Sequence, residues 1–204
     1  MVLPAAEVLT AIGDGEAWQA VTAAQFAGQG SWGNGAAMRV APLGAWFADD
    51  LDRVVEQAAL SAAVTHAHPE ATAGAVAVGV AAALTVRQVP AEDLLPQVAA
   101  RTPDSEVAAR LRRLSRRPFS RQPQWIAGEV GCGALISALD TVPYAIWCAA
   151  RHLDSLVEAL WATVSAGGDM DTTCAIVGGI VAARTGLDAV PGEWVDAREP
   201  LPAG

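Results

Sequence analysis

The residues best suited to chemistry lie in one short run, Gly167-Gly168-Asp169-Met170-Asp171-Thr172-Thr173, which leads directly into an apolar stretch. Two carboxylates two residues apart, followed by two hydroxyls, are hard oxygen ligands of the kind that Mg²⁺ or Mn²⁺ prefers. The two glycines allow a sharp backbone bend, which leaves room for the carboxylate oxygens to converge. In the alternative interpretation this is only a helix start, where Asp171 or Thr172 caps free backbone N–H groups. The run taken alone favours neither interpretation.

Three further segments accompany this run. A glycine-dense loop contains Gly33-Asn34-Gly35-Ala36-Ala37-Met38-Arg39, the junction of two expected helices contains Thr65-His66-Ala67-His68, and a later segment reads Asp140-Thr141-Val142-Pro143-Tyr144-Ala145. In this order, and together with the Gly-Gly-Asp-x-Asp-Thr run, they closely resemble the ADP-ribosylglycohydrolase family, the relatives of dinitrogenase reductase-activating glycohydrolase. The resemblance extends over nearly the whole chain.

The resemblance implies an all-α fold, a compact bundle of many helices. It also implies Mg²⁺-dependent hydrolysis of the glycosidic bond that joins ADP-ribose to a modified protein side chain or small molecule. Members of the family hold two Mg²⁺ ions, and Mn²⁺ is a possible substitute. Carried over position by position, the metal ligands are Asp169, Asp171 and Thr172. The residues carried over as binding ADP-ribose are Gly33, Asn34, Gly35, Ala36, Met38 and His66.

Two acidic motifs of the family, Gly-Asp-x-x-Gly and Thr-Asp-Asp-Thr, have no counterpart in this sequence. The chain therefore resembles the later part of a family member that is truncated at its N-terminus and lacks the first helices, and no catalytic acid is assigned. Two alternatives to a hydrolase follow. One is a catalytically inactive module that binds ADP-ribose, and the other is a truncated remnant without a function.

Composition agrees with a helical protein. Apolar residues form 52% of the 204 residues while aromatic residues form only 5%, and an alanine-rich sequence with few alternating β-branched residues favours packed helices. The length suits a single domain over residues 1–204, with a loosely ordered tail at 191–204. A net charge of −9 argues against a general nucleic-acid surface or an anionic membrane as partner.

No targeting segment is expected. The N-terminus lacks a basic region followed by an apolar run, and the apolar stretch 71–86 is short and alanine-rich for a membrane span. Three widely spaced cysteines indicate neither a disulfide framework nor a zinc site. We therefore expect a cytoplasmic protein, and the sequence leaves its oligomeric state open.

Periodicity and capping residues predict helices along most of the chain. The expected helices cover residues 5–12, 16–25, part of 36–47, 50–64, 69–88, 91–101, 104–115, 140–152, 154–166 and 171–185. Residues 120–128, which follow Pro118 and contain Pro123, are expected to form an irregular loop.

Three features allow more than one role. Arg39 could pair with a ligand phosphate or with an internal carboxylate. Asp140 could be a helix cap, a partner behind the ligand-binding residues, or both. The arginine-rich segment 110–121 is either a solvated helix face or a docking surface for an acidic protein.

Overall fold

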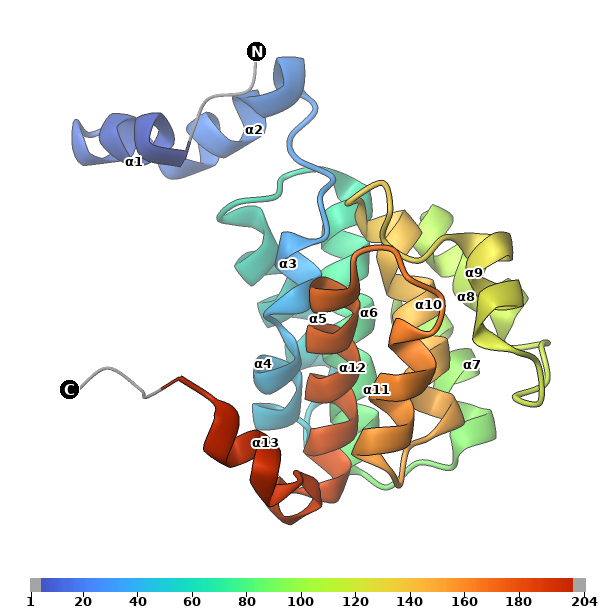
Figure 1. Cartoon of the computed structure of the whole chain (residues 1–204). Coiled ribbons are helices and arrows are strands. Elements are labelled where there is room, and N and C mark those ends of the chain that lie inside the picture. The colour runs from blue at the N-terminus through green and yellow to red at the C-terminus, as the bar shows by residue number, and fades with distance from the viewer. Residues whose placement is uncertain (1–4, 200–204) are drawn as a thin grey trace.

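The computed structural model describes residues 5–199, with side chains from Glu7 onward, and within them the chain is helical without a β-strand. The predicted all-α fold is thus confirmed (Figure 1). The helices are α1 (Ala5–Gly13), α2 (Trp18–Gly28), α3 (Gly35–Met38), α4 (Ala41–Trp46), α5 (Leu51–Ala63), α6 (Pro69–Val86), α7 (Ala91–Arg101), α8 (Glu106–Leu114), α9 (Pro123–Val130), α10 (Ala138–Arg151), α11 (Leu156–Val164), α12 (Met170–Thr185), the 3-10 helix η1 (Leu187–Ala189) and α13 (Gly192–Ala197).

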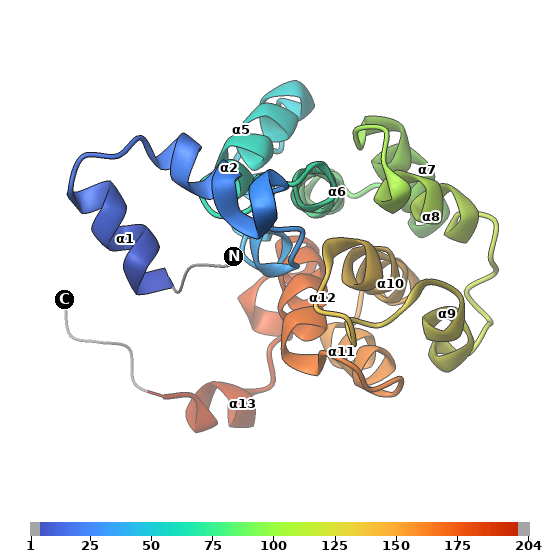
Figure 2. The same cartoon turned by 90° about the horizontal axis from the view of Figure 1, so that it is seen from above.

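Helix α6 is the centre of the bundle, with α3, α4, α5, α7, α8, α10 and α12 packed around it (Figure 2). Its sequence is mostly alanine, glycine and valine, so that neighbouring helices can approach it closely from several directions. Among the described residues it is the one helix long and apolar enough to cross a membrane, but 78% of it is buried inside the fold. Its composition is therefore that of a core helix.

The closest approach in the core joins α4 to α6. A Cβ atom at Gly44 would lie 2.1 Å from the carbonyl oxygen of Gly79, a distance that no side chain could occupy. On another side of α6, the Thr85 hydroxyl donates a hydrogen bond to the Ile180 carbonyl in α12 at 2.9 Å. These contacts fix α4 and α12 against the central helix, and both lead to the candidate site.

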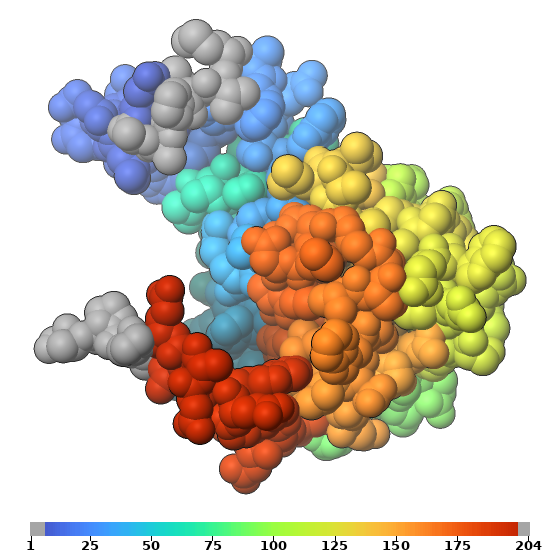
Figure 3. All heavy atoms as spheres, in the orientation of Figure 1, coloured from blue at the N-terminus to red at the C-terminus, as the bar shows by residue number. Residues whose placement is uncertain are grey.

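The first two helices form an arm. Helices α1 and α2 pack mainly against each other and extend away from the bundle, as the space-filling view in Figure 3 also shows. The path turns sharply at Phe26 and Ala27, whose φ angles of 54° and 59° lie in the left-handed region. This turn directs the chain from the arm into the glycine-rich segment that precedes α3.

Several details differ from the sequence predictions. The expected irregular segment contains helix α9, because Pro123 occupies the first turn, where a missing N–H costs nothing. Its Ile126 and Val130 are buried and attach it to the core. In the predicted tail, Gly192–Ala197 forms the exposed helix α13, while residues 200–204 lie outside the described part of the chain.

Candidate functional site

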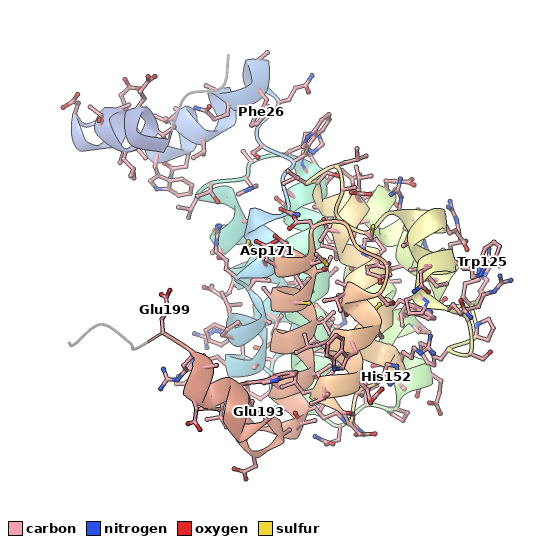
Figure 4. All side chains as sticks on the ribbon, viewed as in Figure 1. Phe26, Trp125, His152, Asp171, Glu193 and Glu199 are labelled. Carbon is pink, nitrogen blue, oxygen red and sulfur yellow. The ribbon has the colours of Figure 1, made fainter. Side chains whose placement is uncertain are left out.

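Three loops meet at one end of the bundle, where α3, α10 and α12 begin. We call them the glycine loop (29–34), the α9–α10 loop (131–137) and the acidic loop (165–169). The glycine loop pairs with the α9–α10 loop: Asn34 N–H donates to the Ile136 carbonyl at 3.3 Å, and Ala138 N–H donates to the Trp32 carbonyl at 3.0 Å. Asp169 N–H donates to the Cys132 carbonyl at 3.3 Å, so that the acidic loop joins the other two. Figure 4 shows Asp171 at this end.

The backbone locks the acidic loop to the α9–α10 loop. Gly168 has a φ of +78°, and a Cβ atom there would lie 2.3 Å from the Cys132 carbonyl oxygen and 2.6 Å from its sulfur. Only glycine satisfies both the left-handed conformation and this contact. The glycine pair was predicted to let the chain bend before Asp169. At Gly168 the absence of a side chain also allows the close contact with Cys132.

Asp169 caps helix α12. Its Oδ1 accepts a hydrogen bond from Thr172 N–H at 3.4 Å, and its Oδ2 accepts one from Asn34 Nδ2 at 2.7 Å. The capping alternative names Asp171 or Thr172, and the structure corrects this assignment: Asp169 is the residue that precedes the first helical residue. Capping leaves room for ligand binding, because a carboxylate oxygen can accept more than one interaction.

Asn34 connects the glycine loop to the acidic run across 135 residues of sequence. It is 4% exposed, and its Nδ2 also donates to the Thr141 hydroxyl at 3.0 Å. Both N–H groups of the amide are therefore used inside the protein. Thr141 was not among the predicted site residues, and its only sequence signal was its place in the Asp-Thr-Val-Pro segment.

Asp169 and Asp171 lie two residues apart, at the residue that precedes α12 and in the first turn of that helix. Partial burial acts to raise the pKa of Asp169, but the hydrogen bonds from the Asn34 amide and from Thr172 outweigh it and hold the pKa below its usual value. In the described part of the chain, neither carboxylate forms an ion pair with an arginine or a histidine. Two adjacent carboxylates without a cationic partner attract a cation.

These oxygen ligands suit a hard divalent cation, but they would fill only part of its coordination sphere. Asp169, Asp171 and Thr172 offer carboxylate and hydroxyl oxygens, as Mg²⁺ requires. Within residues 7–199, however, no group of three or more His, Cys, Asp or Glu side chains could hold a metal by itself. The remaining ligands would come from water, from the substrate or from groups beyond these residues.

His66 closes the glycine loop from the α5–α6 side. A Cβ atom at Gly35 would lie 3.0 Å from its ring, so glycine makes room for the imidazole. Its Nδ1 lies 2.7 Å from the Thr65 hydroxyl, which itself accepts a hydrogen bond from Arg39 at 2.7 Å. Burial, and secondarily the positive charge of Arg39, lower the pKa of His66. A neutral ring that accepts at Nδ1 carries its proton on Nε2, the atom that faces Gly33.

The structure changes the roles expected for several neighbours. Arg39 reaches neither a carboxylate nor the acidic loop: it donates to the carbonyls of Gly35 and Ser61 and to Thr65. Ala36 is buried, so any ligand contact would involve its backbone. Met38 is partly exposed, with its sulfur 3.9 Å from the Thr172 hydroxyl.

Two of the residues carried over as binding ADP-ribose use their backbone N–H groups within the fold. Gly33 N–H donates to the Ser31 hydroxyl at 3.3 Å, and Asn34 N–H donates to Ile136. The cause is the pairing of the glycine loop with the α9–α10 loop, which the sequence did not indicate. An anion-binding nest at this turn would therefore have to begin after Asn34.

The α9–α10 loop has its own supports. Asp140 Oδ2 accepts a hydrogen bond from Leu135 N–H at 2.7 Å, so the carboxylate holds the loop, while Ser137 is the residue that precedes α10. Arg110 Nη1 donates to the carbonyls of Val130 and Leu139, both at 2.9 Å. Arg110 lies in a run of arginines, and nothing in its local sequence distinguishes this role.

Comparison with known proteins identifies the family and the relatives of this chain. The family model described as ADP-ribosylglycohydrolase matches residues 4–202. The human protein named ADP-ribosylhydrolase ARH3 is 32% identical over 207 residues, which covers 86% of this chain and 56% of the human protein. An uncharacterized protein of Archaeoglobus fulgidus is 37% identical over 164 residues, covering 79% of this chain and 52% of the archaeal one. The chain thus spans about half the length of the curated relatives it matches.

Proposed function

Because the chain belongs to the ADP-ribosylglycohydrolase family, we propose that it takes part in Mg²⁺-dependent hydrolysis of a glycosidic bond to ADP-ribose. The bond joins ADP-ribose to a modified protein side chain or small molecule, and its hydrolysis releases ADP-ribose. The human relative is likewise named an ADP-ribosylhydrolase, which supports the same chemistry here.

The observation that carries this proposal is the 2.7 Å hydrogen bond between Asn34 and Asp169. It joins the two segments that the family resemblance assigns to different tasks, the glycine loop to ADP-ribose and the acidic run to metal. A substrate held by the first segment would lie against carboxylates held by the second. Such proximity is required if the site is to act on a bond in that substrate.

The proposed metal ligands are Asp169, Asp171 and Thr172. Mg²⁺ bound there would supply a fixed positive charge that orients and polarises oxygen atoms of the substrate. Asn34 donates to Asp169 and holds its carboxylate in one orientation, while the lowered pKa keeps this group ionised at neutral pH. Hydrolysis at an anomeric carbon develops positive charge on the ribose, which nearby carboxylates stabilise.

The remaining residues around the site suit a nucleotide-like ligand. His66, neutral at physiological pH because its pKa is lowered, presents an N–H group next to the glycine loop. The glycine loop also exposes the large apolar side chain of Trp32, and the α9–α10 loop exposes those of Leu135 and Ile136. Exposed apolar groups gathered around polar ones are typical of a binding surface.

A second candidate function is binding of ADP-ribose without turnover. The small number of charged ligands favours it, because within the described residues no third His, Cys, Asp or Glu side chain joins Asp169 and Asp171 in a metal-binding group. Water can fill part of a Mg²⁺ coordination sphere, so the small number of protein ligands weakens metal binding without preventing it. The two candidates differ in one measurable property, the release of ADP-ribose.

The experiment measures ADP-ribose released from arginine-linked and serine-linked peptides with Mg²⁺ and with a chelator, alongside calorimetric binding of free ADP-ribose. We expect Mg²⁺-dependent release that Asp169→Ala and Asp171→Ala abolish without unfolding the protein. Asp188→Ala, which removes an exposed carboxylate in η1, is the matched control and should be fully active. Saturable binding without release would support the second candidate, and the absence of both would refute the two together.

A further inference from the structure

A second surface is set apart by its charge. In a chain with a net charge of −9, residues 107–128 contain six of the thirteen arginines and no aspartate or glutamate. This segment covers most of α8, the residues after it and most of α9. Figure 2 shows α8 and α9 at the edge of the bundle opposite the α1–α2 arm.

Two of these arginines have structural tasks. Arg110 pairs with Glu106 and with the two carbonyls that flank the α9–α10 loop. Arg117 forms a two-pronged pair with Glu129, with contacts of 2.7 to 3.2 Å. These side chains fix α8 to its neighbours and are not free to receive an anion without losing those partners.

Three others, Arg112, Arg113 and Arg116, are available. Arg112 has one long contact, 3.3 Å, with an Asp104 side chain that is 99% exposed, and such a pair contributes little. Arg113 and Arg116 are exposed, and neither side chain forms an ion pair or hydrogen bond within the part of the chain that the structure describes. Two guanidinium groups, each with five donors, thus face solvent close together.

These arginines surround a hollow. A depression of about 440 Å³ is lined by Ala109, Arg112, Arg113, Arg116 and Arg117. Its size falls in the range of about 300–1,000 Å³ that is typical of small-molecule sites. None of the candidate-site residues lines it. Arginine in the last turn of a helix complements the helix dipole, which accounts for Arg112 and Arg113 but not for Arg116 or for the hollow.

We propose that this hollow binds a compact anion with at least two linked phosphate groups, as in pyrophosphate or a nucleoside diphosphate. Guanidinium groups bind phosphate oxygens through paired hydrogen bonds, and adjacent guanidinium groups suit adjacent phosphates. The lining contains no aromatic side chain that could stack on a base, so recognition depends on the phosphates. All the lining residues lie between positions 109 and 117, and such a short segment suits a small anion better than it suits an extended acidic peptide.

The test is calorimetric titration of the whole chain with inorganic pyrophosphate and, separately, with ADP. We expect one saturable site for pyrophosphate, and ADP should compete with pyrophosphate for this site at similar affinity. The double substitution Arg113→Gln and Arg116→Gln should weaken binding at least tenfold, because each removes charge-assisted hydrogen bonds. Both positions are exposed, so the unfolding midpoint should stay unchanged.

Three control variants show whether the anion binds in this hollow. Arg198→Gln removes an exposed arginine elsewhere and should leave the affinity unchanged. Arg113→Lys with Arg116→Lys keeps the charge but removes the forked donors, and should also weaken binding. Asp169→Ala, which damages the candidate metal site, should have no effect on pyrophosphate binding, so this proposal can fail or succeed independently of the proposed hydrolysis.

The proposal is overturned if pyrophosphate shows no saturable binding, or if the double glutamine variant binds as well as the unaltered protein. Loss of pyrophosphate binding in Asp169→Ala would show that the anion binds at the candidate site, and this result would likewise overturn the proposal. Binding of a single-stranded oligonucleotide to the segment, without displacement by pyrophosphate, would also overturn the proposal, because the partner would then be a nucleic acid.

Discussion

Replacing Asn34 by alanine tests whether one amide holds the candidate site together. The substitution removes two hydrogen bonds, to Asp169 at 2.7 Å and to Thr141 at 3.0 Å, from a side chain that is 4% exposed. A bond to a charged group contributes about 1.5–3 kcal/mol and one between neutral groups about 0.5–1.5 kcal/mol. We therefore expect Asn34→Ala to lower the free energy of unfolding by about 2–4 kcal/mol.

The assay is urea unfolding at neutral pH without divalent cations. Thr141→Val keeps the shape of a buried residue and removes only the neutral bond, so it should cost about 1 kcal/mol. Gln124→Ala removes an exposed amide that donates to the Ser165 carbonyl, and it should cost less than about 1 kcal/mol. If Asn34→Ala lowers the free energy of unfolding no more than Gln124→Ala does, the hydrogen bond between Asn34 and Asp169 does not stabilise the protein in solution, and the reasoning is wrong.

The same variant predicts a dependence on pH. The pKa of Asp169 is lowered in the folded protein, so this carboxylate adds stability above its unfolded pKa and loses that contribution as the pH falls through the folded value. Asn34→Ala should raise the folded pKa toward its ordinary value. The stability difference between the two proteins should therefore be full at pH 7 and shrink below about pH 4. A constant difference down to about pH 2.5 would contradict this assignment.

Three further perturbations test the loops and the metal ligands. Gly168→Ala should lower the free energy of unfolding in urea by about 2–4 kcal/mol, because the new methyl group clashes with Cys132 and the backbone is left-handed. Gly167→Ala has the same positive φ but open space around its Cβ position, so it should lose only the part that comes from the left-handed backbone. Arg110→Met should cost about 2–4 kcal/mol, since two carbonyls lose a charged donor, whereas equal effects of Arg110→Met and the exposed Arg112→Gln would refute the anchoring role. Mg²⁺ should raise the thermal midpoint of the unaltered protein, and Asp171→Asn should reduce this rise; an undiminished rise would remove Asp171 from the metal ligands.

The helical architecture could be predicted because its signals are local. Alanine-rich segments, prolines in first turns and glycine at Gly186 mark helices and their ends, and residues 91–101 form a helix with the predicted bounds. The prediction was wrong for α9, where Pro118 and Pro123 suggested a loop. There Ile126 and Val130 bury themselves against the core, and this packing outweighs the weak local preference.

The sequence by itself determined that Asp169, Asp171 and Thr172 lie together, because residues two or three apart at a helix start cannot separate. It also determined the family, through motifs that keep their order along the chain. Only the tertiary structure decided which distant groups hold them: the Asn34 amide is 135 residues from Asp169 in sequence. It likewise decided that Arg110 supports the α9–α10 loop while Arg113 and Arg116 remain unpaired within the described residues. The physical reason is that a hydrogen bond between loops requires both partners at bonding distance, and the packing of helices around α6 sets that distance.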